Sequence, residues 1–414
     1  MKLLESHSFA GCQFPGRKGI SEVVQEIERQ RKARKDFIVN SSKLEMKVID
    51  DQMLLEVPAP GERLLLPATR GVFSRIAQDM GIRQTDRFYK WLTLGTQANK
   101  ASERHDIRKN WKVWAGLIND YWRTEKEGKL VRVMEKPKEG PYCRALLTDK
   151  YKIIDNADFF FNIADRCMDM KAQIVHARLS EDTFYGYAMA EGISGQVSLD
   201  RTFDPGDGWQ SRWYGEEGDV CNAAMAFGNS ETGAGGCFLK KAILRRICQN
   251  YNIWHDVVAK THIGRRMELD TVLTAETLQK QNEVFFLEIK DHVASVFDPV
   301  KFQEMIDVMN NATRDEVREA EVAVEAINLC FDLGETRKNI LREHFLRNLD
   351  NSRFGLANAI TQMAHHDSID ADKGFELECV GTEVLNTSML ALIGRADVLA
   401  KSKAKKKEDA TVGV

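Results

Sequence analysis

The chain has 414 residues, 43% of them hydrophobic and 29% charged, with a formal net charge of −3 and a pI near 6.4. This length exceeds what a single hydrophobic core supports, so the chain is expected to fold as two or three units. The near-neutral charge excludes a protein that is basic throughout, as DNA-coating proteins often are, but it leaves room for a local basic face. The eight cysteines form no C-x-x-C pair and no stretch approaches the roughly 20 apolar residues that span a bilayer, so the sequence predicts a cytoplasmic protein without a membrane partner.

The N-terminal unit, residues 1–125, is predicted to combine helices with two short strands. Residues 19–37 have the pattern of a charged helix with a basic end. The alternating runs 43–49 and 52–58 indicate two strands joined at an Asp-Asp turn. Residues 67–124 show apolar positions at spacings of three and four, which predicts further helices.

The last of these helices carries three tryptophans, Trp111, Trp114 and Trp122. An aromatic stripe of this kind has two interpretations, a platform on which bases stack or a face buried in the core. Tryptophan is mostly a large packing residue. We therefore expect this stripe to be core.

The middle unit, residues 126–272, is predicted to be a mainly antiparallel sheet. A helix is expected at 156–170, and a long loop rich in turn residues at 201–218. The strands are expected at residues 129–136, 142–150, 173–179, 183–190, 195–199 and 220–227.

The C-terminal unit, residues 273–397, has little glycine and is predicted to be all-helical, followed by a disordered basic tail at 398–414. Helices are expected at residues 275–296, 301–311, 315–331, 335–348, 352–364 and 373–394. Strands and helices do not alternate along the chain, which excludes a Rossmann or barrel fold. The predicted class is α+β, with a mainly antiparallel sheet core, a helical N-terminal part and an all-α C-terminal part.

A polar, glycine-rich turn follows the strand at 220–227. It has two interpretations, a hairpin turn whose glycines take positive φ or a turn that also packs against the backbone of a ligand. The residues of this candidate turn are Asn229, Ser230, Gly233, Gly235 and Gly236.

Basic side chains follow the turn within an apolar run, at Lys240, Lys241, Arg245 and Arg246. The run fits either a strand or a helix, and in both cases the arginines need anionic partners. Internal carboxylates or an external phosphate satisfy that need, and a second basic cluster favours the phosphate. That cluster consists of His262, Arg265 and Arg266.

Other candidate site residues carry weaker signals. Trp209, Trp213 and Tyr214, in the 201–218 loop, are candidates for base stacking. His365 and His366 are adjacent rather than four residues apart, so a helix does not let them bind one metal together. The sequence contains no recognised catalytic motif, so it predicts no catalytic residue, no metal and no cofactor, and it favours a non-enzyme over an enzyme.

Several short motifs resemble, in their order, a family of phage- and plasmid-borne proteins of unknown function. The resemblance covers about residues 20–390 and is most specific over 142–266. It departs from the family at the inserted 201–218 loop and at Tyr251 and Asn252, where the family tends to have glycine. The motifs are RALLTDKYKIIDN at 144–156, GDVCNAAMAFGNSETGAGG at 218–236, LRRICQN at 244–250 and HIGRR at 262–266.

The resemblance implies a role in the DNA metabolism of a mobile element, in the cytoplasm of its host cell. A more distant likeness to single-strand annealing recombination proteins is an analogy of fold alone. The leading hypothesis is therefore a protein that binds single-stranded DNA in recombination or replication, with a homo-oligomer as a further candidate partner. The alternatives are a non-enzymatic oligomeric or interaction protein and a metal-dependent enzyme that processes nucleic acid.

Overall fold

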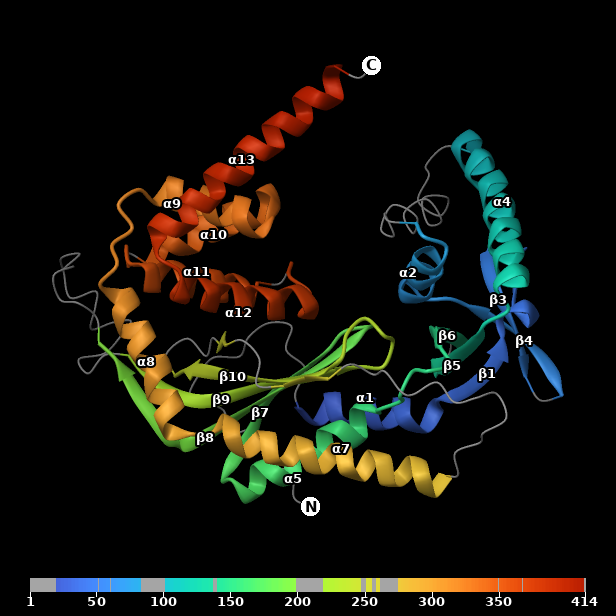
Figure 1. Ribbon diagram of the computed structural model, residues 1–414, viewed down its shortest axis with the longest axis horizontal. Coiled ribbons are helices and arrows are strands. Elements are labelled where there is room, and N and C mark those ends of the chain that lie inside the picture. Colours follow the sequence, from blue (N-terminus) through green and yellow to red (C-terminus); the bar gives the residue numbers. More distant parts are fainter. Residues whose placement is uncertain are drawn as a thin grey trace.

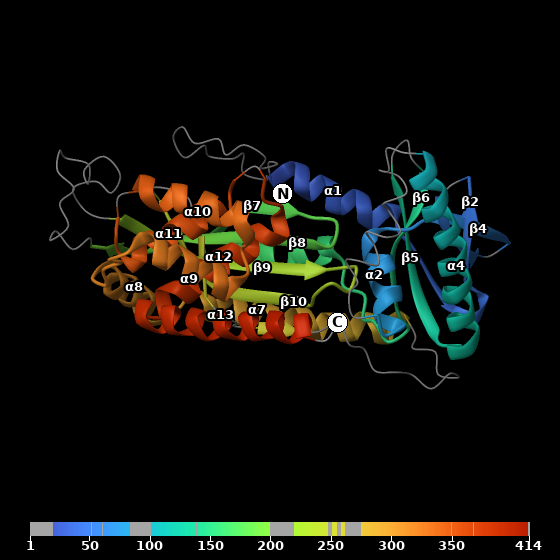
Figure 2. The ribbon, with the colours of Figure 1, turned by 90° about the horizontal axis from the view of Figure 1, so that it is seen from above.

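A small lobe and a main lobe make up the molecule (Figure 1). The main lobe is a curved antiparallel sheet with helices on both faces, and the small lobe stands at one end of that sheet (Figure 2). The protein is therefore α+β, as predicted. The computed structural model describes residues 20–50, 52–59, 61–82, 101–136, 140–198, 219–246, 251–254, 258–260, 275–348, 350–366 and 368–412.

The described residues of the small lobe form two antiparallel sheets, with strand orders β1-β5-β6 and β2-β3-β4, and two α-helices. A short 3₁₀ helix, η1, joins β1 to β2 and packs against α4. The elements are β1 (Lys35–Asn40), η1 (Ser41–Lys43), β2 (Glu45–Ile49), β3 (Gln52–Ala59), β4 (Glu62–Pro67), α2 (Arg70–Asp79), α4 (Ala101–Glu125), β5 (Gly128–Lys136) and β6 (Gly140–Thr148).

The tryptophan stripe of α4 lies in the core of the small lobe. Trp111 is 4% exposed and Trp122 is 1% exposed, and both pack against strands of both sheets and against α2. Trp114 is partly buried against the same core. The prediction that these rings are structural rather than a stacking platform is confirmed.

The main sheet has the strand order β11-β10-β9-β8-β7, and β12 also pairs with β10. Every pairing in it is antiparallel, so neighbouring strands alternate in direction. Its strands are β7 (Ala172–Leu179), β8 (Thr183–Val197), β9 (Asp219–Ser230), β10 (Cys237–Arg245), β11 (Tyr251–Ile253) and β12 (Val258–Lys260).

Three helices cover one face of the main sheet: α1 (Ile20–Ala33), α5 (Asn156–Asp169) and α7 (Ala275–Val296) (Figure 1). Phe159 and Phe160 of α5 are buried against this face. A Cβ atom on Gly186 would lie 2.2 Å from Cζ of Phe227, so glycine is what lets that ring lie across β8. This face therefore forms the largest part of the core.

The C-terminal helices lie at the far end and on the opposite face of the sheet (Figure 1). α12 packs against β11, and α11 packs against α12. We call α11 and α12 the roof. The helices are α8 (Pro299–Thr313), α9 (Ala320–Phe331), α10 (Gly334–Asn348), α11 (Arg353–Met363), α12 (Ala371–Asn386) and α13 (Met389–Val412).

Side chains that accept hydrogen bonds fix where these helices begin. Asp298 accepts from the amides of the first turn of α8, next to Pro299 at the start of that helix. Ser352 and Asp370 do the same for α11 and α12. Each cap satisfies donors that a helix leaves unpaired at its first turn. α7 begins and ends at the predicted residues, and it was identified from periodicity alone.

Two of the predicted boundaries are wrong. β1 pairs along its length with β5, so the small lobe does not end at residue 125 but continues through β6. α1, in turn, packs on α5 and β7 of the main lobe. The 398–414 tail was predicted to be disordered, but α13 continues as a helix to Val412.

Three further elements differ from prediction. β4 was not predicted. β8 is one long strand rather than two, because a bulge between Ala190 and Ser194 lets it bend without ending. The helix expected at 373–394 is divided between α12 and α13, since Thr387 takes an extended conformation. None of the described helices is long and apolar enough to cross a membrane.

Candidate functional site

The glycine-rich turn joins β9 to β10 and packs on the small lobe. Gly233 has a φ of +81°, and a Cβ atom there would lie 2.6 Å from Cδ2 of Leu147 on β6. The hydroxyl of Tyr151 donates to the carbonyl oxygen of Ser230 at 2.6 Å. By contrast, a Cβ atom on Gly235 would meet nothing within 4 Å. Gly233 is therefore needed by the fold, although it is exposed together with Ala234 and Gly235.

The polar residues that lead into the turn are occupied inside the protein. Asn229 is fully buried, and its amide donates to the carbonyl oxygen of Ile154 and to Oδ1 of Asn156. Ser230 donates to the carbonyl oxygen of Asp182 at 2.8 Å. These contacts hold the start of α5 and the β7–β8 connection against the turn. Asn229 and Ser230 are therefore structural residues of the turn rather than surface groups that reach a ligand.

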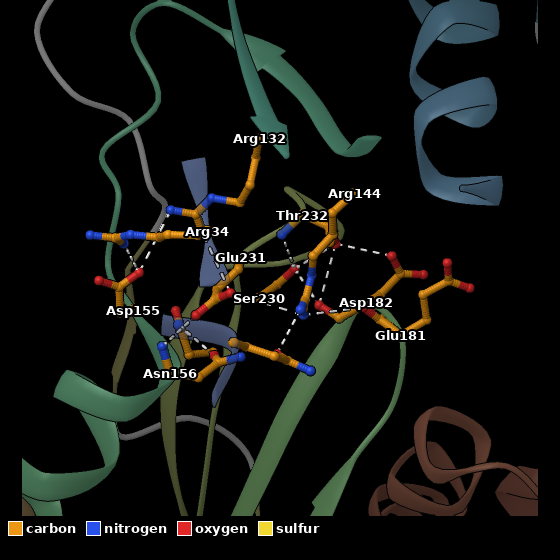
Figure 3. A network of polar contacts seen from close by, with 12 residues as sticks. Arg34, Arg132, Arg144, Asp155, Asn156, Glu181, Asp182, Ser230, Glu231 and Thr232 are labelled. Carbon is orange, nitrogen blue, oxygen red and sulfur yellow. Dashed lines mark hydrogen bonds and ion pairs between the residues drawn. The ribbon is translucent and has the colours of Figure 1, made fainter. Parts of the chain in front are cut away.

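Beneath the turn, a fully buried arginine faces three carboxylates (Figure 3). Arg132 of β5 donates from Nε and Nη2 to the Asp36 carboxylate, at 3.0 and 3.2 Å. Its Nη2 lies 3.6 Å from Oδ1 of Asp155, and its Nη1 lies 3.3 Å from Oε2 of Glu231. These carboxylates come from β1, the start of α5 and the turn. We call Arg132, Asp36, Asp155, Glu231 and the adjoining Arg34 and Arg144 the joint network.

Arg144 and Glu231 extend the joint network between the lobes. Glu231 accepts from the backbone amide of Asn156 at 2.7 Å and lies 3.9 Å from Nη2 of Arg144. Arg144 of β6 also donates to Oε1 of Gln30 on α1 at 2.6 Å. Two arginines of the small lobe, Arg132 and Arg144, thus meet three segments of the main lobe: α1, the start of α5 and the turn. The network fixes how the lobes lie together.

Burial acts differently on the two kinds of charge in the joint network. Burial alone would lower the pKa of Arg132, but the carboxylates of Glu231 and Asp36 outweigh it and raise that pKa. Burial raises the pKa of Asp155 to about 6, although the adjacent Arg34 guanidinium acts in the opposite direction. A buried ion pair of this kind specifies geometry more than it adds stability. The joint network is therefore a structural connection with one acid that titrates near neutral pH.

The sequence indicated the joint network only indirectly. Arg132 lies between Val131 and Val133 in a strand with an apolar run, and a cation in such a position requires an anionic partner. Nothing in the sequence shows that Glu231 and Asp155 are those partners. The structure does show that two motifs distant in sequence, 144–156 and 218–236, contact each other here.

The prediction that Arg245 contacts phosphate is wrong. The segment is a strand through Arg245, and the arginine is 2% exposed and paired with the buried carboxylate of Asp219. Its guanidinium also lies 4.9 Å from the centroid of the Phe354 ring on α11. An arginine that is already neutralised and covered cannot neutralise an external phosphate.

The remaining cations of the segment do not share one face. Lys240 and Lys241 are neighbours on β10, so their side chains leave opposite faces of the sheet. The amine of Lys240 lies 5.8 and 5.6 Å from the ring centroids of Phe238 and Phe375. Burial and the positive charge of Lys301 lower the pKa of Lys241. The cations of β10 are therefore divided between the two faces of the sheet.

Arg246, just after β10, is exposed and donates from Nε to Oδ1 of Asn222 at 2.7 Å. It lies at the end of β10 that is distant from the glycine-rich turn. Six other candidates lie outside the described residues, and they are Trp209, Trp213, Tyr214, His262, Arg265 and Arg266.

The described backbone nevertheless relates the second basic cluster to the turn. β12 pairs with the first residues of β10, with Lys260 opposite Cys237. Cys237 directly follows Gly236, the last residue of the turn. The chain therefore leaves β12 beside the turn, two residues before His262 in the sequence.

A second buried arginine lies under the roof, at the edge strand β7. Arg178 donates from Nη2 to Oε1 of Glu378 on α12 at 2.7 Å, and Tyr187 donates to the other oxygen of that carboxylate at 2.7 Å. His176 and His365 each lie within hydrogen-bond distance of the guanidinium. We call these five residues the roof cluster. Burial alone would lower the pKa of Arg178, but Glu378 outweighs it and raises that pKa.

The roof cluster was missed because its members come from four separate elements. His365 had been weighed only together with its neighbour. The structure separates the two, since His365 faces Arg178 whereas His366 is exposed and bonded to Ser368. Among the described residues, no group of three or more His, Cys, Asp or Glu side chains is placed to hold a metal ion.

Comparisons with protein families, with characterised proteins and with solved structures find no match to this chain. The geometry described above is therefore the basis on which a function is proposed.

Proposed function

We propose that this chain is a nucleic-acid-binding protein of a phage or plasmid that takes single-stranded DNA in recombination or replication. Its binding surface is centred on the exposed part of the glycine-rich turn rather than on the length of β10. The observation that carries the proposal is the pairing of Lys260 with Cys237, because it places Lys260, two residues before His262 in the sequence, beside the turn.

The exposed turn suits a close backbone approach. Ala234 and Gly235 are exposed, and no protein atom lies within 4 Å of the position of a Cβ on Gly235. Backbone amides in such a turn bind anions when cationic side chains stand nearby. Lys240, on the same hairpin, has its amine over the rings of Phe238 and Phe375. Together with His262, Arg265 and Arg266 it supplies the positive charge.

Because Arg245 is no longer a candidate, fewer cations are expected to neutralise phosphates at the proposed site. Each phosphate that a protein neutralises on a single strand changes the slope of log K against log salt by about −0.7. Three to four cations near the turn predict a slope of roughly −2 to −3, which is typical of weak, salt-sensitive binding.

The test is a salt titration of binding to a fluorescent oligo(dT) by the wild type and by the double variant Arg265→Gln/Arg266→Gln. We expect the variant to lose roughly 1.4 units of slope and to bind more weakly at low salt. Arg318→Gln is the matched control, because Arg318 is 87% exposed on its side chain but lies near the start of α9. Equal slopes for the wild type and the double variant contradict the proposal.

A second candidate function is self-association through the C-terminal helices. Leu390 is 83% exposed and Val398 is 67% exposed on α13, beside a groove of about 400 Å³ between α9, α10 and α13. Exposed apolar groups next to a groove are typical of an interaction surface. Light scattering with and without the oligonucleotide separates the two functions, since an assembly that ignores DNA supports only the second.

A further inference from the structure

The roof cluster fixes the protonation state of two histidines. A guanidinium has five N–H donors and no acceptor, so an imidazole nitrogen that it bonds must carry no proton. Nε of Arg178 donates to Nε2 of His176 at 3.1 Å. Nη2 of Arg178 lies 3.2 Å from Nδ1 of His365, which must therefore accept as well. Both imidazoles are neutral in this arrangement, with the proton on Nδ1 of His176 and on Nε2 of His365.

The contacts of Arg178 leave little freedom to rearrange. Its Nη2 is shared between Glu378 and His365. On its other side, a Cβ atom on Gly374 of α12 would lie 3.0 Å from Nη1 of Arg178. The side chains of Arg178 and His365 are 10% and 7% exposed, and that of Glu378 is fully buried. An added positive charge at either histidine is therefore poorly solvated.

Protonation converts both histidine contacts with Arg178 from attractive to repulsive. An imidazolium has two donors and no acceptor, so it loses its bond from Arg178 and stands next to a like charge. Glu378 is the counter-charge for Arg178, and Nε2 of His365 lies 3.6 Å from the same carboxylate oxygen. The titratable and charged groups in contact with the two histidines are Arg178 on β7, Tyr187 on β8 and Glu378 on α12. Tyr251 on β11 lies behind them, against the ring of Tyr187.

We propose that the roof cluster is an acid-sensitive latch, which holds α11 and α12 on the main sheet at neutral pH and releases them when His176 and His365 gain protons. The released face of the sheet carries Tyr185, Tyr187 and Met189, which are buried under the roof at neutral pH. The latch lies at the edge strand β7, so release begins at the rim of the sheet. It is independent of the proposed nucleic-acid function.

The test is amide hydrogen exchange followed by mass spectrometry at pH 7.5 and pH 5.5, corrected for the intrinsic effect of pH on exchange. We expect protection in α12 and β7 to fall at least tenfold at pH 5.5, while β5 and β6 keep theirs. In the double variant His176→Gln/His365→Asn, the amide oxygens occupy the places of Nε2 and Nδ1 as permanent acceptors. Its protection in α12 and β7 should not change with pH.

The control is His344→Gln. Burial lowers the pKa of His344 on α10, so acid also protonates this histidine at a cost to the folded state. That variant should still release α12 and β7 at pH 5.5. If the double variant does not fold, ¹⁵N chemical shifts of the wild-type imidazoles decide the question, since they report which nitrogen of each ring carries the proton. Equal protection of α12 and β7 in the wild type at both pH values overturns the proposal, as does finding either histidine protonated at pH 7.5.

Discussion

The joint network and the roof cluster are both built around a buried arginine, but they differ in what surrounds it. Arg132 is faced by three carboxylates, whereas Arg178 is faced by one carboxylate and two imidazoles. Acid therefore acts on them in opposite directions. In the joint network, acid neutralises a buried carboxylate, which removes an unfavourable buried charge. In the roof cluster, acid adds a positive charge to a histidine beside Arg178, which is unfavourable. The comparison shows that a buried arginine is rigid or switchable according to its acceptors.

The largest effect is expected from Glu231→Ala in the joint network. The change leaves Arg132, which is fully buried, with one carboxylate fewer and also removes the acceptor for the backbone amide of Asn156. Breaking a buried pair from one side typically costs about 3–5 kcal/mol. Urea unfolding should show a loss of this size in the free energy of unfolding.

Glu316→Ala is the control for that prediction, because Glu316 has a side chain 65% exposed and pairs only at 3.7 Å with Arg318. It should change the free energy of unfolding by less than about 1 kcal/mol. Similar losses for the two variants would show that the joint network does not hold the lobes together.

A smaller effect is expected from Gly233→Ala, which tests whether the turn must be seated on the small lobe. The substitution forces a residue with a side chain to keep a φ of +81° and brings its Cβ against Leu147. We expect a loss of about 1–3 kcal/mol in the free energy of unfolding. Gly235→Ala is the matched control and should change it by no more than about 0.5 kcal/mol, since that position is open. Equal losses would mean that the whole turn is constrained.

Much of the fold follows from local patterns in the sequence. The ends of α7, four strands of the small lobe (β2, β3, β5 and β6) and the burial of the tryptophan stripe were predicted from local patterns, because each depends on residues close in the chain. β1 and β4 were not predicted. The segment containing Arg245 fitted a strand and a helix equally well. The segment is a strand because it pairs with β9 and β11, and this pairing depends on residues outside the segment itself.

The candidate sites depend on such long-range contacts almost entirely. Arg245 was expected at a phosphate because the sequence does not show that Asp219 lies beside it. The adjacent His365 and His366 were not expected to share a metal site, and nothing in the sequence showed that His365 meets Arg178, which comes from a strand far earlier in the chain. Sequence patterns identify residues that need partners, whereas the fold decides which partners they meet.

The smallest predicted effect is a pH-dependent change in the free energy of unfolding, which distinguishes the joint network from the roof cluster. Burial raises the pKa of Asp155 to about 6, above the value near 3.9 expected in the unfolded chain. Between these values the folded protein binds more protons than the unfolded chain, so this carboxyl stabilises the fold as the pH falls through 6. The difference in free energy of unfolding between the wild type and Asp155→Asn should therefore move in favour of the wild type by about 1 kcal/mol from pH 7 to pH 5. Taking the difference cancels the acid response of the roof cluster, which both proteins share and which has the opposite sign. A difference that stays constant across this range would mean that Arg34 and Arg132 keep Asp155 ionised, and the contrast between the two sites would then rest on the histidines alone.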